Sequence, residues 1–287
     1  MKVIHTIKEL KEYVHQCKKD WKSIGLVTTM GALHEGHASL IAAARKENDF
    51  VITSVFVNPT QFGPNEDYAS YPRDIQTDYS LCQSAGVDAV FHPEPEELYL
   101  PNRATTVHVT GLTDVLCGAK RPGHFDGVCL VLSKLFSIVN PDRAYFGQKD
   151  AQQVAVVRRM VRDLNFGVDV IACPIVREAG GLARSSRNAY LSAEEKAAAL
   201  VLNRSLSRAL QAMQSGERSA DLIRRQVADQ IAAEPLARID YVEVVDFEDL
   251  RPVQGPMARP VLVAVAVFFG TTRLIDNVVF GPEQEVR

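Results

Sequence analysis

The chain has 287 residues, of which 46% are hydrophobic and 23% are charged. This length predicts one large domain or two unequal ones, and the apolar content excludes a disordered chain. A net charge of −3 indicates no basic surface for nucleic acid. The five cysteines are odd in number and form no Cys-x-x-Cys pair, so we expect a reducing, cytoplasmic setting.

We expect neither a signal peptide nor a membrane partner. Residues 1–5 lead into the charged stretch Lys8–Glu12, which does not fit a secretory leader. The longest apolar run, Val261–Phe269, is far shorter than the ~20 residues of a membrane-spanning helix.

The first two thirds of the chain alternates between apolar strand-like runs and helical patterns. It opens on a capping box, Thr6-Ile7-Lys8-Glu9, whose hydroxyl and carboxylate bind the exposed amides of a helix start. This alternation predicts a parallel sheet covered by helices on both faces. We expect helices over residues 7–20, 37–48, 74–85, 127–139 and 149–164, and strands over residues 24–28, 50–57, 88–91, 143–146 and 168–172.

The pattern changes after Val176. A second capping box, Ser192-Ala193-Glu194-Glu195, opens an alanine-rich helix expected to reach residue 215, and another helix is expected over 219–233. Strand-like runs follow at 239–245, 261–268 and 273–279. Helices followed by successive strands predict a small α+β domain with an antiparallel sheet. We therefore expect an α/β domain over residues 1–180 and an α+β domain over residues 181–287.

A histidine pair follows the first strand of the α/β half. His34 and His37 are three residues apart, so in a first helical turn they share one face. Gly31 and Gly36 allow a phosphate to approach the backbone, and a helix start attracts anions. Two imidazoles there could donate hydrogen bonds to a transferring phosphate. The alternatives are a structural histidine pair and, less well matched to the spacing, a zinc site.

Two later segments are rich in groups that bind polyphosphates. Ala183–Asn188 places two hydroxyls and two guanidiniums within four residues, although a solvated basic loop explains it equally well. In Phe146–Gln153, Lys149 is a point charge suited to a β- or γ-phosphate, and Asp150 could accept from ribose hydroxyls. The alternative for these two residues is an exposed ion pair in a first helical turn.

These segments follow predicted strands, and ligands bind open parallel sheets at the carboxyl ends of strands. A further segment of this kind, Asn58–Gly63, supplies amides for a small polar substrate. The chain has no Gly-x-Gly-x-x-Gly fingerprint, no P-loop and no Gly-x-Ser-x-Gly elbow. A nucleotide would therefore be bound through the histidine pair and the Ser-Ser-Arg segment.

The chain strongly resembles the pantothenate synthetase (pantoate–β-alanine ligase) family of the nucleotidyltransferase superfamily, which includes the class I aminoacyl-tRNA synthetases. The resemblance covers nearly the whole chain, and its most specific segments are residues 29–37, 56–63, 145–150 and 185–188. It implies a Rossmann-like parallel sheet that binds nucleotide and pantoate, a C-terminal α+β lid domain, and a homodimer.

The resemblance also implies a two-step, Mg²⁺-dependent reaction. The carboxylate of pantoate attacks the α-phosphate of ATP, and the amine of β-alanine then attacks the pantoyl adenylate. The Mg²⁺ is held mainly through the ATP phosphates, with no protein ligands assigned.

The site residues that the resemblance implies fall into three groups. The catalytic group is His34, His37, Lys149, Ser185, Ser186 and Arg187. Pantoate is held by Gln61 and Gln153, and β-alanine by Gln61. ATP is bound by Met30, Gly31, Ala32, Leu33, His34, Glu35, Gly36, His37, Gly147, Gln148, Lys149, Asp150, Val176, Arg184, Ser185, Ser186 and Arg187.

Three other functions stay open on the sequence alone. One is an adenylate-forming transferase of the same superfamily that uses a different acid, against which the Gln61 and Gln153 pair argues. The second is a metal-dependent hydrolase that uses His34, Glu35 and His37. The third is a nucleotide-sensing module that binds ATP without forming AMP.

Overall fold

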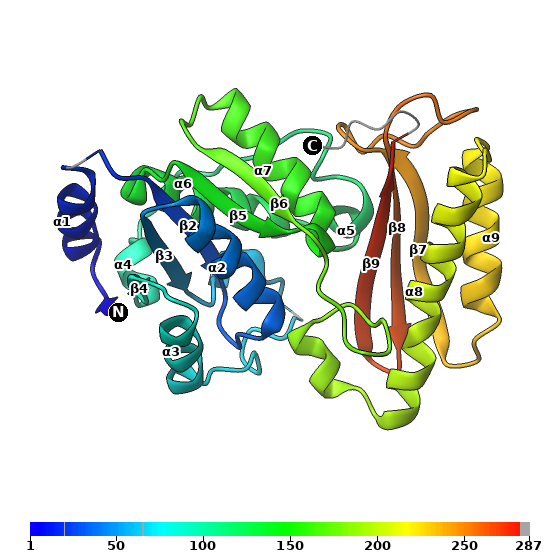
Figure 1. Cartoon of the computed structure of the whole chain (residues 1–287), viewed down its shortest axis with the longest axis horizontal. Helices are drawn as coiled ribbons and strands as arrows, with labels where there is room; N and C mark the ends of the chain where they lie inside the picture. The colour runs from blue at the N-terminus through cyan, green and yellow to red at the C-terminus, as the bar shows by residue number, and fades with distance from the viewer. Residues whose placement is uncertain (20, 65, 282–287) are drawn as a thin grey trace. The chain divides into compact units, whose positions relative to one another are not determined.

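The computed structural model describes residues 1–19, 21–64 and 66–281, and the chain divides into two compact units (Figure 1). The first unit comprises residues 1–114, 118–148 and 156–174. The second comprises residues 115–117, 149–155 and the chain from 175 onward. The domain boundary at residues 180 and 181 stays a prediction, because compactness alone does not define a functional domain.

A six-stranded parallel sheet forms the first unit, in the order β1-β4-β3-β2-β5-β6. Helices flank this sheet, which confirms the predicted fold class (Figure 1). The strands are β1 (Lys2–Ile4), β2 (Ile24–Thr29), β3 (Phe50–Val55), β4 (Ala89–Phe91), β5 (Arg143–Gly147) and β6 (Asp169–Cys173). The helices in this part of the chain are α1 (Ile7–Lys18), α2 (Glu35–Glu47), α3 (Ile75–Ser84), α4 (Pro95–Leu98), α5 (Leu116–Lys120), α6 (His124–Val139) and α7 (Ala151–Asp163), with 3₁₀ turns η1 (Pro59–Gln61) and η2 (Gln148–Asp150).

The central strand β2 fixes where loops of the first unit can meet. Its Ile24, Leu26 and Val27 have no exposed surface, as expected for a parallel strand covered on both faces. After β2, the next two strands along the chain, β3 and β4, lie on one side of it, and the later strands β5 and β6 lie on the other. The strand order therefore reverses beside β2, and such a switch point is where open α/β sheets bind ligands.

The element boundaries depart from the sequence predictions in a few places. Helix α2 begins at Glu35 rather than at residue 37, because the His34 side chain caps it. Helix α6 begins at His124, three residues before the predicted start. The three-residue strand β1 was not predicted, because it is too short for a periodic pattern and is defined by its pairing with β4.

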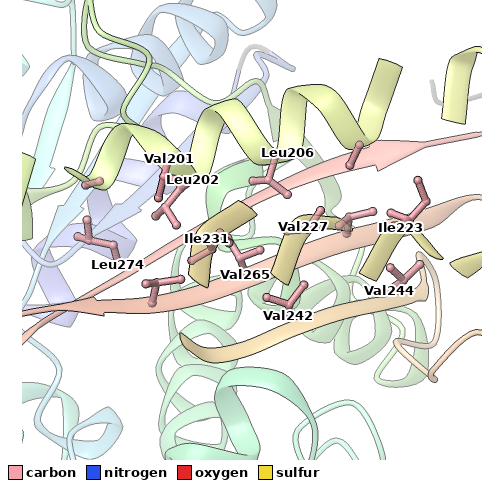
Figure 2. Close-up of a cluster of buried hydrophobic side chains, with 14 of the residues drawn as sticks. Val201, Leu202, Leu206, Ile223, Val227, Ile231, Val242, Val244, Val265 and Leu274 are labelled. Atoms are coloured by element: carbon pink, nitrogen blue, oxygen red, sulfur yellow. The ribbon is translucent and has the colours of Figure 1, made fainter. Parts of the chain in front are cut away.

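A three-stranded antiparallel sheet and two helices form most of the second unit, as predicted. The sheet has the order β7-β8-β9, and α8 packs against β8 and β9 while α9 packs against β7. Figure 2 shows the apolar side chains of α8 and α9 meeting those of the sheet. The elements are α8 (Ala193–Gln214), α9 (Ala220–Ala232), β7 (Ala237–Asp246), β8 (Val261–Phe269) and β9 (Thr272–Phe280), preceded by the 3₁₀ turn η3 (Ser186–Tyr190).

Both predicted capping boxes are present, at Thr6 before α1 and at Ser192 before α8. In each, the hydroxyl and the glutamate three residues later bind each other's backbone amide, so the helix starts are fixed locally. Within the described part of the chain, no helix has both the length and the apolar character needed to cross a membrane.

Candidate functional site

The turn between β2 and α2 adopts a conformation that few residues tolerate. Gly31 has φ +84° and Ala32 has φ +50°, so both lie in the left-handed region. For a non-glycine residue such as Ala32, this costs about 1–2 kcal/mol. A β-carbon on Gly31 would also lie 2.9 Å from an Asp78 oxygen, so glycine is required there. The strained turn needs an interaction that holds it in place.

That interaction comes from the buried carboxylate of Asp78 on α3. It accepts hydrogen bonds from the backbone N–H groups of Ala32, at 3.1 Å, and Leu33, at 2.7 Å. Burial raises the pKa of Asp78, and the two N–H donors counteract that shift only in part. The sequence did not single out Asp78, because a lone acidic residue within a helical pattern gives no signal of such a contact.

The two histidines of this turn cap α2 with their side chains. His34 is the N-cap residue, and its Nδ1 accepts a hydrogen bond from the Gly36 N–H at 3.1 Å. The Nδ1 of His37 accepts from the His34 N–H at 3.2 Å. The ring centroids are 4.2 Å apart, which confirms that the two side chains share one face of the first turn.

This capping arrangement determines which histidine nitrogens can donate. Because each Nδ1 accepts a backbone hydrogen bond, a neutral imidazole must bear its proton on Nε2; this tautomer is inferred from the hydrogen bonds. Two Nε2–H donors therefore belong to one helix start, at the carboxyl end of the central strand. Paired N–H donors at a helix N-terminus are suited to an anion such as a phosphate.

Gln61 is brought to the same turn from the loop after β3. Its Nε2 lies 3.0 Å from the Met30 sulfur, and its Oε1 accepts from the Asn58 amide at 2.9 Å. Asn58 also caps η1, which ends at Gln61. The structure therefore joins Met30 and Gln61, which lie 31 residues apart in the sequence.

The backbone of Gln61 is fixed by residues at the start of α6. The His124 Nδ1–H donates to the Gln61 carbonyl at 2.8 Å, and the ring's Nε2 accepts from Arg121 at 3.0 Å. Arg121 also binds both carboxylate oxygens of Glu66, at 2.7 and 2.6 Å. Burial opposes ionisation of Glu66, but the guanidinium outweighs it and lowers the pKa of this carboxyl.

Lys149 and Asp150 lie in the 3₁₀ turn η2, and Gln153 lies in the first turn of α7; all three belong to the second unit. The Lys149 side chain is 20% exposed, and its ammonium is 3.4 Å from the carboxylate of the more exposed Asp150. Gln152 is buried and binds backbone at both ends, accepting from the Cys117 N–H at 2.9 Å and donating to the Val115 carbonyl at 2.7 Å. Gln152 therefore has a structural role, whereas its neighbour Gln153 is partly exposed.

A small hairpin supports the Ser-Ser-Arg segment. The Arg184 N–H donates to the Val176 carbonyl at 2.8 Å, and the chain turns between these residues at Gly181, which has φ +95°. Ser185 then caps η3 by accepting from the Arg187 N–H at 3.3 Å. The side chains of Ser185, Ser186 and Arg187 are each partly exposed, so they can reach a ligand.

Glu178 links this hairpin to η3. Its Oε1 accepts from the Asn188 amide at 2.9 Å and from Arg184 at 3.0 Å, and both contacts lower the pKa of the Glu178 carboxyl. The segment Ala183–Asn188 holds no carboxylate in sequence, but the fold supplies one from outside it. The Arg184 guanidinium is thus committed to an ion pair in this structure.

The predicted site residues divide between the two units. Met30–His37, Gln61, Gly147 and Gln148 belong to the first, and Lys149, Asp150, Gln153, Val176 and Arg184–Arg187 belong to the second. Among residues 1–19, 21–64 and 66–281, no three His, Cys, Asp or Glu side chains group so as to hold a metal ion. The described structure therefore lends no support to a hydrolytic metal centre at His34, Glu35 and His37.

Comparisons with known proteins identify one family. Residues 2–279 match the family model described as pantoate-beta-alanine ligase. The chain is 57% identical over 278 residues to a pantothenate synthetase of Clostridioides difficile (strain 630), covering 97% of this chain and 98% of the relative. A pantothenate synthetase of Clostridium novyi (strain NT) is 58% identical over 277 residues, covering 96% and 98%.

Solved structures give the same result. The crystal structure of pantothenate synthetase from Thermus thermophilus has a TM-score of 0.91 and 47% identity, covering 97% of this chain and 99% of that one. Pantoate-beta-alanine ligase from Francisella tularensis, complexed with beta-gamma ATP and beta-alanine, has a TM-score of 0.78 and 31% identity, covering 99% and 100%.

Replacement of Asp78 tests how the β2–α2 turn is held. Asp78→Asn keeps the side-chain shape but turns one acceptor oxygen into a donor, so one turn N–H loses its partner. We expect hydrogen exchange at the amides of Ala32 and Leu33 to accelerate by about tenfold or more, because losing a buried hydrogen bond costs ~1–3 kcal/mol.

Asp74→Asn is the matched control, since Asp74 caps the same helix but does not contact the turn. It should leave exchange at Ala32 and Leu33 unchanged, because asparagine caps a helix about as well as aspartate and the Asp78 contacts remain. Equal exchange rates at the turn in the two variants would contradict the role given to Asp78.

Proposed function

This chain belongs to the pantoate–β-alanine ligase family and is an ATP-dependent ligase of pantothenate biosynthesis; we propose that it works through a pantoyl-adenylate intermediate. The observation that best supports this chemistry is the histidine capping box at the carboxyl end of β2. It gives two Nε2–H donors at a helix N-terminus, which suits a phosphate during transfer.

In the first step, a carboxylate oxygen of pantoate attacks the α-phosphorus of ATP. A bond forms between that oxygen and phosphorus, the bond to the α–β bridging oxygen breaks, and pyrophosphate leaves. Such transfers depend mainly on positioning and on stabilisation of charge. We assign His34 and His37 to the phosphates as hydrogen-bond donors, a role that needs no net proton transfer.

In the second step, the amine of β-alanine attacks the acyl carbon of pantoyl adenylate. The carbon–nitrogen bond forms, the carbon–oxygen bond to AMP breaks, and the amine gives up a proton as AMP leaves. We assign Gln61 to both pantoate and β-alanine, and Gln153 to pantoate. The support for Gln61 is its position beside Met30, held by Asn58 and His124.

The cationic residues of the second unit are assigned to the polyphosphate. Lys149 supplies a point charge, and Ser185, Ser186 and Arg187 supply hydroxyl and guanidinium donors at a 3₁₀ turn. We also propose ATP contacts for Gly147, Gln148, Asp150, Val176 and Arg184. For Gly147, support comes from the open space that a β-carbon would meet there, which allows a ligand to approach the backbone.

We propose that Mg²⁺ arrives on the ATP phosphates. The assigned segments offer mainly N–H donors, hydroxyls, guanidiniums and an ammonium, a donor set suited to phosphate oxygens. Mg²⁺ takes phosphate, carboxylate and water oxygens and is often held through the nucleotide. When bound, it would neutralise phosphate charge and so complement Lys149 and Arg187.

Two further features belong to the proposal. A homodimer rests on the family resemblance, and light scattering on the purified protein would measure it. A cytoplasmic location is supported by the five cysteines, all of which are free thiols in the structure, as expected in a reducing compartment.

Substrate omission tests the reaction. With Mg²⁺ present, we expect ATP–pyrophosphate exchange to require pantoate alone, because pyrophosphate leaves in the first step. Rapid AMP release should begin only when β-alanine is added. Folded protein that binds ATP but shows no exchange with pantoate would indicate a different acid substrate or a nucleotide binder without catalysis.

Removal of one histidine tests the phosphate site. His37→Ala should slow exchange by about 100-fold or more, the usual effect of losing a donor to developing charge. Its melting temperature should change little, because the lost cap costs only ~1 kcal/mol. His15→Ala, at an exposed position on α1, is the control. If His37→Ala exchanged ATP and pyrophosphate at the rate of the unmutated protein, the assignment of His37 to the phosphates would be refuted.

Variants of the adjacent Gln152 and Gln153 distinguish a substrate-binding role from a structural one. Gln153→Ala should raise the KM for pantoate by about tenfold, equivalent to a lost hydrogen bond of ~1.4 kcal/mol, with the KM for ATP nearly unchanged. Gln152→Ala should instead lower thermal stability, since it leaves the Cys117 N–H and the Val115 carbonyl without this partner. The same kinetic change in both variants would argue against pantoate binding by Gln153.

A further inference from the structure

The edge strand β9 buries two adjacent polar side chains, Asp276 and Asn277, which are 2% and 3% exposed. Burying such groups costs free energy unless hydrogen bonds replace their contacts with water. Neither residue belongs to the motifs predicted to bind substrate. Their partners therefore indicate what this part of the strand contributes.

Asn277 binds the backbone of the predicted catalytic lysine. Its Nδ2 donates to the Lys149 carbonyl at 3.0 Å, across 128 residues of sequence. That carbonyl lies in η2, the turn that leads into α7. The contact fixes the main chain from which the Lys149 ammonium projects.

Asp276 binds the base of the hairpin that leads to Ser185. Its carboxylate accepts from both terminal nitrogens of Arg177, at 2.7 and 3.0 Å, and is itself 1% exposed. The same guanidinium donates to the Gly181 carbonyl at 3.1 Å, so it also binds the hairpin turn. A second Asp276 contact, from the Asn277 N–H at 2.8 Å, keeps the carboxylate in place.

Neighbouring residues on a strand point to opposite faces, so the two contacts leave β9 in different directions. Asp276 shares its face with Leu274, which belongs to the apolar cluster in Figure 2. Asn277 shares its face with Arg273, which binds Asp240 at 2.8 Å. One short piece of strand is therefore attached to the Lys149 turn on one side and to the Arg177 hairpin on the other.

We propose that Asn277 is a positioning residue for adenylate formation and that it acts through the main chain of Lys149. This inference rests on the proposed role of Lys149 at the ATP phosphates. Phosphoryl-type transfers depend on placement, and a displacement of about 1 Å can cost ~100-fold in rate. Loss of the Asn277 donor frees the Lys149 turn to shift while leaving its side chain unchanged.

The two half-reactions distinguish positioning from general support of the fold. Adenylate formation uses the triphosphate, to which Lys149 is assigned. Transfer of the pantoyl group from preformed adenylate to β-alanine does not involve the β- and γ-phosphates. A defect in positioning Lys149 should therefore slow only the first, whereas a damaged fold should slow both.

The test replaces Asn277 by leucine, which has a similar volume but no donor. We expect ATP–pyrophosphate exchange to fall by about tenfold or more, and pantothenate formation from synthetic pantoyl adenylate and β-alanine to stay within about twofold of the parent. Val279→Ala is the matched control, because it removes packing from the same face of β9. It should leave both half-reactions unchanged.

A double-mutant cycle with Lys149→Ala completes the experiment. If Asn277 acts through Lys149, Asn277→Leu should slow exchange little further in the Lys149→Ala background. Three outcomes would overturn the inference and leave the role of Lys149 intact. Asn277→Leu could slow both half-reactions, it could exchange at the unmutated rate, or its loss of exchange rate could multiply fully with that of Lys149→Ala. Parental exchange in Lys149→Ala would instead refute the proposed role of Lys149, and the inference with it.

Asn277→Ser provides a second variant if the leucine variant does not fold. Its hydroxyl is polar enough for a buried position but too short to reach the Lys149 carbonyl. The same selective loss of exchange is expected, and parental exchange in a folded Asn277→Ser protein would overturn the inference.

Discussion

The hydrogen bonds from the Ala32 and Leu33 amides to the buried Asp78 carboxylate are the interaction on which the first unit's site depends. They hold a turn whose left-handed residues would otherwise favour other conformations. The turn determines where α2 begins, and the start of α2 determines the orientation of His34 and His37. One buried charge thus positions the two donors assigned to the phosphates.

The same physical arrangement recurs at other loops of the candidate site. A buried or half-buried polar side chain of the scaffold binds the backbone of a loop and so fixes the main chain from which the loop's own side chains project. His124 binds the Gln61 carbonyl in this way, and Asn188 binds the Ala183 carbonyl beside the Ser-Ser-Arg segment. Asn277 does so for Lys149. A hydrogen bond to the loop backbone fixes the position of a side chain without using the polar groups of that side chain.

Family membership and physical argument answer different questions about this chain. The matches over nearly its whole length establish the ligase family, its fold and its reaction. They do not explain why His34 and His37 present Nε2–H groups, or why Gln152 and Gln153 differ in role. Those answers come from hydrogen bonds of the structure, and the roles of individual site residues are our proposals from that geometry.

The sequence by itself determined the features that depend on near neighbours. The capping boxes at Thr6 and Ser192 start helices where predicted, since their partners lie three residues away. The alternation of strands and helices gave the parallel sheet, and the spacing of His34 and His37 gave their shared face. Only the tertiary structure decided the contacts of Asp78 and Asn277, which span 46 and 128 residues. A hydrogen bond between distant segments leaves no local pattern, because it exists only after the chain has folded.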